Sequence, residues 1–85
     1  MQGTADALIA EYIEQPPDRP GPADVRLREY CVPVWTLIGY WKAANGDVER
    51  VAADYRVPVS AVEAAVAYYK RNKAVIDGKI AANTL

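Results

Sequence analysis

The chain contains no histidine and only one cysteine among its 85 residues. Histidine is the commonest general base in enzymes, so the usual group for proton transfer is missing. Cys31 has no imidazole to activate it as a nucleophile and no second cysteine for an intrachain disulfide. We expect a lone thiol of this kind to be buried or interfacial. The protein is therefore expected to be non-enzymatic and to work in a reducing compartment.

Several other functional signatures are also missing from the sequence. It has neither the spacing of metal-ligand residues nor a glycine-rich phosphate loop, so we expect no metal and no cofactor. No apolar run approaches the length that spans a bilayer, and the first residues lack the pattern of a signal peptide. These absences predict a soluble cytoplasmic protein with no membrane partner.

Charge is balanced over the whole chain but not along it. The formal net charge is -1, which gives no general attraction to nucleic acid or membranes. Residues 1–25 carry five acids against one base, whereas residues 26–85 carry nine bases against six acids. A basic body behind an acidic N-terminal segment can still hold a local positive face.

The distribution of apolar residues and prolines predicts a mostly α fold. We expect a small helix-turn-helix domain with one short strand, an N-terminal helical arm and a long C-terminal helix. The expected divisions are residues 1–23 for the arm and its connector, 24–73 for the helix-turn-helix domain, and 74–85 for a helical tail. Four prolines between Gln15 and Ala23 make the connector stiff and extended, which separates the first helix from the rest.

Residues 24–32 form the one strand that the pattern supports, with Val25 and Leu27 pointing to the same side. A single strand leaves its backbone groups unpaired. It must pair with a short local partner, with a second copy of the chain, or with a different protein. We expect the second copy, which would make the protein a homodimer.

Residues 34–44 predict a second helix that is apolar on nearly all sides and is therefore buried on more than one side. One face should pack on the helix-turn-helix, and the other needs a second surface. Gly46 is suited to end this helix in a left-handed conformation. We assign Trp41 to the core and place Trp35 and Tyr40 on a partner-binding surface, because aromatic side chains anchor interfaces.

Residues 47–71 predict two helices joined by a tight turn at residues 56–58. Asp47 is placed to cap the first of these helices. Ala52 is small enough to let the two helices approach closely, while Val57 and Val62 fill the space between them. This spacing indicates a helix-turn-helix, a unit used for contacting DNA or as a compact docking scaffold.

The last of these helices is expected to begin near Pro58 and to continue into the tail. Its apolar stripe is extended by Ile76 and Ile80 beyond a basic cluster. The region past Asn72 should extend beyond the core of so small a domain. We therefore place Val75, Ile76 and Ile80 on a surface that binds a partner.

DNA is a second candidate partner, through basic side chains of the helix-turn-helix. Near its start, the second helix presents Ser60 and Glu63 but no Arg, Lys, Asn or Gln, the residues that usually read base edges. Readout of a specific sequence by this helix alone is not expected. The alternative is that the charges only solubilise a structural helix-turn-helix. The candidate DNA-binding residues are Arg50, Arg56, Ser60, Lys70, Arg71 and Lys73.

A family resemblance covers residues 24–71. The segment Leu-Arg-Glu-Tyr-Cys-Val-Pro-Val at residues 27–34 resembles the Ile-Arg-Gly-Thr-Arg-Ile-Pro-Val segment of domain-of-unknown-function family 433. The apolar helix, the acidic short helix ending in Asp-Tyr and the Ala-Ala-Val-Ala-Tyr-Tyr end of the last helix are similar as well. Glu29, Tyr30 and Cys31 replace the Gly, Thr and second Arg of the family, so a role tied to that loop is not carried over.

Members of that family often resemble antitoxins encoded beside small nucleases with a PIN-like fold. The resemblance implies an antitoxin of a type II toxin-antitoxin pair that neutralises a nearby-encoded toxin by direct binding. It also implies dimerisation and allows repression of the protein's own promoter. Two alternatives are a stand-alone DNA-binding transcriptional regulator and a structural subunit of a larger assembly.

Overall fold

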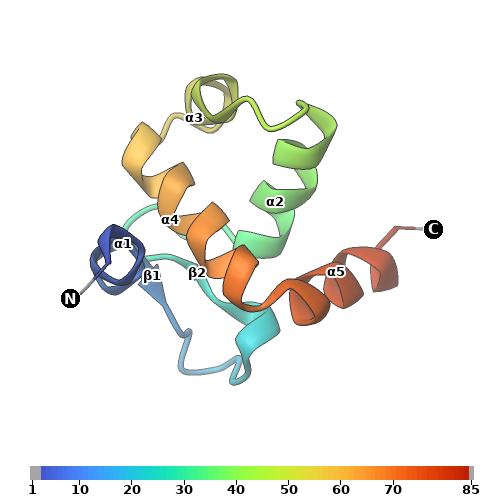
Figure 1. The fold of residues 1–85 in the computed structure, drawn as a ribbon. Helices are drawn as coiled ribbons and strands as arrows, with labels where there is room; N and C mark the ends of the chain where they lie inside the picture. The colour runs from blue at the N-terminus through green and yellow to red at the C-terminus, as the bar shows by residue number, and fades with distance from the viewer. Residues whose placement is uncertain (1–2, 85) are drawn as a thin grey trace.

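The computed structural model describes residues 3–84, and most of these residues are helical. Figure 1 shows one helix, α4, at the centre, with α1 and α5 on opposite sides of it. The expectation of a mostly α fold with a short strand is confirmed. The elements in chain order are α1 (Thr4–Tyr12), β1 (Ile13–Glu14), the 3-10 helix η1 (Pro22–Asp24), β2 (Arg26–Leu27), α2 (Val34–Ala43), α3 (Val48–Tyr55), α4 (Val59–Arg71) and α5 (Lys73–Ala82).

The core is built around the small residues of α4. Ala61, Val62, Ala64 and Ala65 are completely buried, and α4 contacts each of the other four helices. Small side chains let neighbouring helix axes come close, and the axial distance between packed helices depends on the side chains at the contact. A single helix therefore fixes the positions of all the others.

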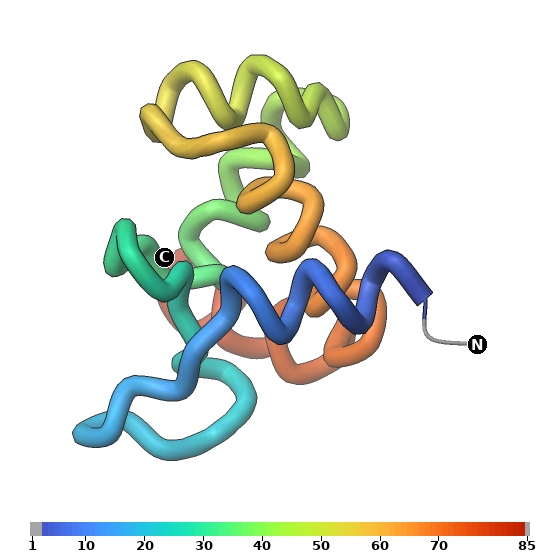
Figure 2. Tube along the Cα trace, turned by 90° about the vertical axis from the view of Figure 1, so that its left-hand side faces the viewer, coloured from blue at the N-terminus to red at the C-terminus, as the bar shows by residue number. Residues whose placement is uncertain are grey.

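The first helix is not an arm. It packs against α4, and Figure 2 shows α1 lying across α4 with the proline-rich connector looping away below it. Apolar side chains of α1, including Leu8 and Ile9, lie against the core cluster. The prolines of residues 16–22 therefore do not hold the helix apart, because the connector turns back and returns the chain to the domain.

The expected strand is much shorter than residues 24–32, and its partner is local. Arg26–Leu27 pairs antiparallel with Ile13–Glu14, with Ile13 opposite Leu27 and Glu14 opposite Arg26. The backbone N–H of Arg28 also donates to the carbonyl of Tyr12 at 2.7 Å. The expectation that a second copy pairs with this strand is wrong, because the chain itself satisfies these backbone groups.

The apolar helix α2 is covered on more than one side by other elements of the same chain. Leu37 and Ile38 are fully buried, and α2 contacts α3, α4, α5 and η1. The helix ends as expected at Gly46, which has φ +80° and donates its N–H to the carbonyl of Trp41 at 2.9 Å. No external partner is needed to cover the buried side of α2.

The long C-terminal helix is interrupted at Asn72. Its backbone leaves the helical region at φ -132° and ψ 39°, and its side-chain amide donates to the carbonyl of Tyr68 at 3.0 Å. A side chain that bonds to the preceding turn competes with the helical ladder at this point. The result is a separate helix, α5, which folds back instead of extending into solvent.

The packing of α5 rests on Ile76, which is completely buried, next to Val75, which is 38% exposed. We expect Ile76→Ala to lower the free energy of unfolding by about 2–5 kcal/mol, because it leaves a cavity in the core. The neighbouring control Val75→Ala should change it by less than about 0.5 kcal/mol. Denaturant unfolding followed by circular dichroism measures both. Equal effects of the two substitutions would contradict the docked position of α5.

Candidate functional site

The helix-turn-helix consists of α3 and α4, joined by residues 56–58. The Asp47 side chain accepts a hydrogen bond from the Arg50 N–H at 3.1 Å and so caps α3. Arg56 ends α3 in the left-handed conformation with φ +57°. The contact residues proposed from the sequence, Ala52, Val57 and Val62, are all buried. Both the turn and its packing are therefore as the spacing predicts.

The face of α4 that remains outside the core carries a mixed set of side chains. Val59, Glu63 and Lys70 are exposed, and Val66 is half-buried between them. These positions recur at steps of three and four residues and so form one stripe along the helix. The stripe combines two apolar groups with one acid and one base, which is a poor set for reading base edges.

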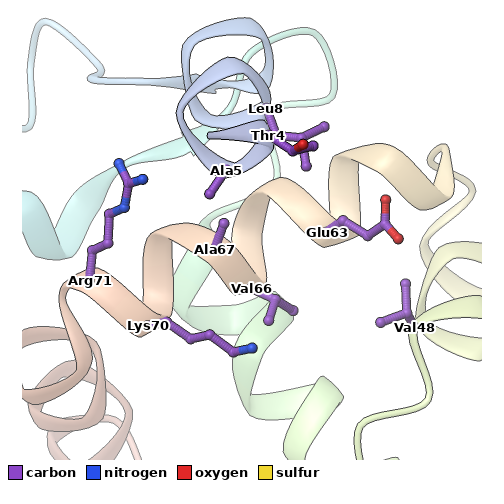
Figure 3. A pocket seen from close by; sticks show the side chains of 9 residues that line it. All are labelled: Thr4, Ala5, Leu8, Val48, Glu63, Val66, Ala67, Lys70 and Arg71. Carbon is purple, nitrogen blue, oxygen red and sulfur yellow. The ribbon is translucent and has the colours of Figure 1, made fainter. Parts of the chain in front are cut away.

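Beside this stripe, α1 and α4 enclose a groove of about 480 Å³. Figure 3 shows Glu63 toward the start of α4, near Val48 of α3, and Lys70 and Arg71 toward its end. The middle of the groove is apolar, so an occupant would meet an apolar floor with opposite charges at its two ends. The lining residues are Thr4, Ala5, Leu8, Val48, Glu63, Val66, Ala67, Lys70 and Arg71.

Several of the residues predicted to bind DNA are engaged within the chain. The hydroxyl of Ser60 shares a hydrogen bond of 2.8 Å with that of Tyr12, which comes from α1. Arg71 forms an ion pair with Asp6, also from α1. Arg50 lies 3.8 Å from Asp54 on its own helix. The first helix therefore occupies groups that the sequence assigned to phosphate contacts.

The other predicted DNA-binding residues, Arg56, Lys70 and Lys73, are exposed. They do not form one cluster together with Arg50. Arg50 and Arg56 belong to α3 and its turn, at the start of α4, whereas Lys70 and Lys73 lie at its far end. A helix of 13 residues separates the two groups by about 20 Å.

Of the residues predicted to bind a partner, one is buried in the structure and others are accessible. Ile76 is completely buried, so its assignment to a binding surface is wrong. Trp35 and Ile80 are half-buried, and the Lys79 ammonium lies 6.0 Å from the centre of the Trp35 ring. Val75 is exposed. Val75 is therefore the most accessible of these residues, whereas Trp35 and Ile80 are only partly accessible.

Tyr40 is used inside the domain. Its hydroxyl donates to the carboxylate of Asp54, and its ring meets that of Tyr55 edge-on with centroids 5.6 Å apart. It links α2 to α3 and is only half-buried. Trp41, assigned to the core, is also half-buried and packs edge-on against Tyr69 at 6.1 Å.

A polar cluster fastens α5 to α2 and α4. The Asp77 carboxylate accepts from Lys42 Nζ at 2.6 Å and from the Tyr69 hydroxyl at 2.8 Å. The hydrogen bond from Lys42, followed by that from Tyr69, lowers the pKa of the Asp77 carboxyl below its usual value. The same contact with Asp77 raises the pKa of the Lys42 ammonium. These groups bridge three helices and serve the fold.

The outward face of α5 was missed by the sequence reasoning, which took Ile76 and Ile80 to define its apolar stripe. Beyond the exposed Lys73 at its first position, the exposed side of this helix is instead uncharged and consists mostly of small residues. Small residues at intervals of four, Ala74, Gly78 and Ala82, indicate this face in the sequence. A prediction based on large apolar side chains does not detect them. The exposed residues on this face are Ala74, Val75, Gly78, Ala81 and Ala82.

A second hollow, of about 270 Å³, lies beside Cys31 and Trp35. Two of its charged side chains form ion pairs: Arg26 donates to Glu14 at 2.7 Å, and Asp24 lies 3.1 Å from Lys79. Asp18 and Arg19 also line this hollow. Cys31 is exposed, so its thiol is not buried within the chain, and the interfacial thiol stays a prediction. Within residues 3–84, no group of acidic, cysteine or histidine side chains is arranged to hold a metal, and no helix is long and apolar enough to cross a membrane.

The Asp77 cluster predicts a specific dependence of stability on pH. A carboxyl whose folded-state pKa is lowered stabilises the fold above its unfolded pKa, and this stabilisation is lost as the pH falls through the folded value. We therefore expect the wild type to lose stability below about pH 4, and Asp77→Asn to lose less over the same range. Denaturant unfolding at a series of pH values measures the difference. Parallel acid profiles for the two proteins would contradict this role of Asp77.

Comparisons of the chain with protein-family models, with curated proteins and with solved structures found no match. The resemblance of residues 24–71 to family 433 therefore stays a prediction. The surfaces of α4 and α5 are the features from which a function can be argued.

Proposed function

We propose that the protein is a non-enzymatic antitoxin that neutralises a PIN-like nuclease by binding it directly. The resemblance of residues 24–71 to family 433 suggests the class of partner. The observation that carries the proposal is the outward face of α5, defined above by its five exposed, uncharged residues. A soluble helix normally presents charged or polar side chains on the side that faces water.

Packing within the described chain does not account for this face. Ile76 already docks α5 from the opposite side, and the Asp77 cluster fixes its position. Ala74, Gly78 and Ala82 are four residues apart, and such small residues permit the close approach of another backbone. Val75 supplies the one large apolar side chain, with 38% of its surface exposed.

The charges around α5 indicate the character of the partner. Lys73 is exposed at the start of α5, whereas Arg71 is paired with Asp6 and Lys79 with Asp24. The Lys73 ammonium beside this apolar face complements an acidic group on the partner, which aids both encounter and orientation. In this arrangement a toxin covers Val75 and reaches the exposed edges of Trp35 and Ile80.

Co-expression of a tagged chain with the protein encoded beside it tests the proposal. We expect the two proteins to purify as a stable complex, and the nuclease activity of the partner to be lost in that complex. Val75→Glu should weaken the complex by about tenfold or more, because it places an unpaired charge in the contact. Ala53→Glu is the control, since Ala53 is exposed but lies on α3 and does not line the groove.

Three outcomes would count against the antitoxin. The first is that the neighbouring protein forms no complex, and the second is that its nuclease activity survives in the complex. The third is that Val75→Glu and Ala53→Glu weaken the complex equally. A stable complex with a protein that has no nuclease activity would instead favour a structural subunit of a larger assembly.

DNA binding is the second candidate function, favoured by the short turn between α3 and α4. The contacts of Ser60 with Tyr12 and of Arg71 with Asp6 oppose it, because they hold α1 against the helix that would enter the major groove. Arg56, Lys70 and Lys73 remain exposed and are able to contact phosphates. Such contacts position a protein on DNA without selecting a sequence.

We therefore expect any DNA binding to be weak, equal for unrelated duplexes and steeply reduced by salt, because it depends on phosphate contacts. Arg56→Ala and Lys70→Ala should lower the affinity for every duplex alike. Fluorescence anisotropy over a salt series measures these effects. A preference for one DNA sequence that persists at physiological salt would contradict the expected non-specific binding. It would favour a stand-alone DNA-binding transcriptional regulator instead.

A further inference from the structure

The exposed stripe of α4 has a charge pattern that is complementary to itself. Glu63 and Lys70 lie seven residues apart on one side of the helix, which is two turns, or about 10 Å. Val66 and Ala67 lie midway between them. Figure 3 shows the acid and the base at opposite ends of the groove, with these two small apolar side chains between them.

We propose that a second copy of the chain docks antiparallel on this stripe, related to the first by a twofold axis that passes between Val66 and Ala67. Under that symmetry, Glu63 of each copy faces Lys70 of the other. The apolar centre packs against itself in the same arrangement. A twofold interface uses the same patch on both copies, which requires a self-complementary surface of this kind.

The order of charges selects the antiparallel arrangement. A parallel neighbour would place Glu63 beside Glu63 and Lys70 beside Lys70, which is repulsive at both ends. The formal net charge of -1 per chain adds little general repulsion between two copies. The contact between the copies is therefore decided by the local pattern.

The walls of the groove must contribute to the contact. A typical stable interface buries roughly 800 Å² on each partner. This is about 15% of the 5211 Å² of accessible surface here, which is more than one helical stripe offers. Leu8 of α1 and Val48 of α3 border the stripe and are half-buried, so they are placed to complete it. The dimer is accordingly expected to dissociate on dilution.

This interface differs from the one expected from the sequence, where a second copy extends β2. It is also separate from the outward face of α5, because α1 and α5 lie on opposite sides of α4 (Figure 1). Dimerisation on α4 therefore leaves the α5 face free. Dimerisation through α4 involves only copies of this chain and requires no toxin.

Charge reversal tests the inference by sedimentation velocity over a concentration series. The wild type should dimerise reversibly. Glu63→Lys and Lys70→Glu should each weaken dimerisation by about tenfold or more, since each creates two like-charge contacts across the axis. An equimolar mixture of the two variants should form a mixed dimer. The double variant Glu63→Lys/Lys70→Glu has the wild-type composition and should dimerise again.

Glu29→Lys is the matched control, because Glu29 is exposed in the turn after β2 and does not line the groove. It should dimerise like the wild type, and circular dichroism should show unchanged helix content in all variants. A wild type that stays monomeric at every concentration would overturn the inference. So would a dimer indifferent to both reversals, or single variants that remain monomeric when mixed. A monomer that binds a peptide of another protein in this groove would also overturn the proposed dimer.

Discussion

The burial of the small-residue face of α4 is the contact on which the other elements depend. Because Ala61, Ala64 and Ala65 carry single methyl groups, four helices can pack closely against one. A larger side chain at any of these fully buried positions would overpack the core. The parts of α4 that packing leaves free, the stripe with Glu63, Val66 and Lys70, are then the parts available for function.

This arrangement changes what the helix-turn-helix can do. In a DNA reader, the outer face of the second helix is open and carries hydrogen-bonding side chains. Here α1 packs across that helix; its Tyr12 shares a hydrogen bond with the Ser60 hydroxyl, and its Asp6 forms an ion pair with Arg71. The same addition turns a flat helix face into a walled groove. One extra helix thus makes this face of the scaffold less suited to contact with a duplex.

Local signals allowed much of the fold to be predicted. Asp47, Gly46 and the turn at residues 56–58 specify their own conformations, so the bounds of α2 and α3 followed closely from the sequence. The position of α1, the partner of β2 and the break at Asn72 depend on contacts between distant residues, which local patterns do not contain. The same reason explains the wrong assignment of Ile76: its spacing showed a stripe, but only packing decides which side of α5 faces the core.

The proline-rich connector has a consequence for conformational entropy. Four prolines between Glu14 and Val25 restrict the backbone of the unfolded chain, so fewer states are lost when the connector closes. The attachment of α1 therefore costs less than a flexible connector of equal length would require. The first helix is therefore held as one wall of the groove in two ways. Its contacts with α4 stabilise the folded state, and the prolines of the connector lower the conformational entropy of the unfolded chain.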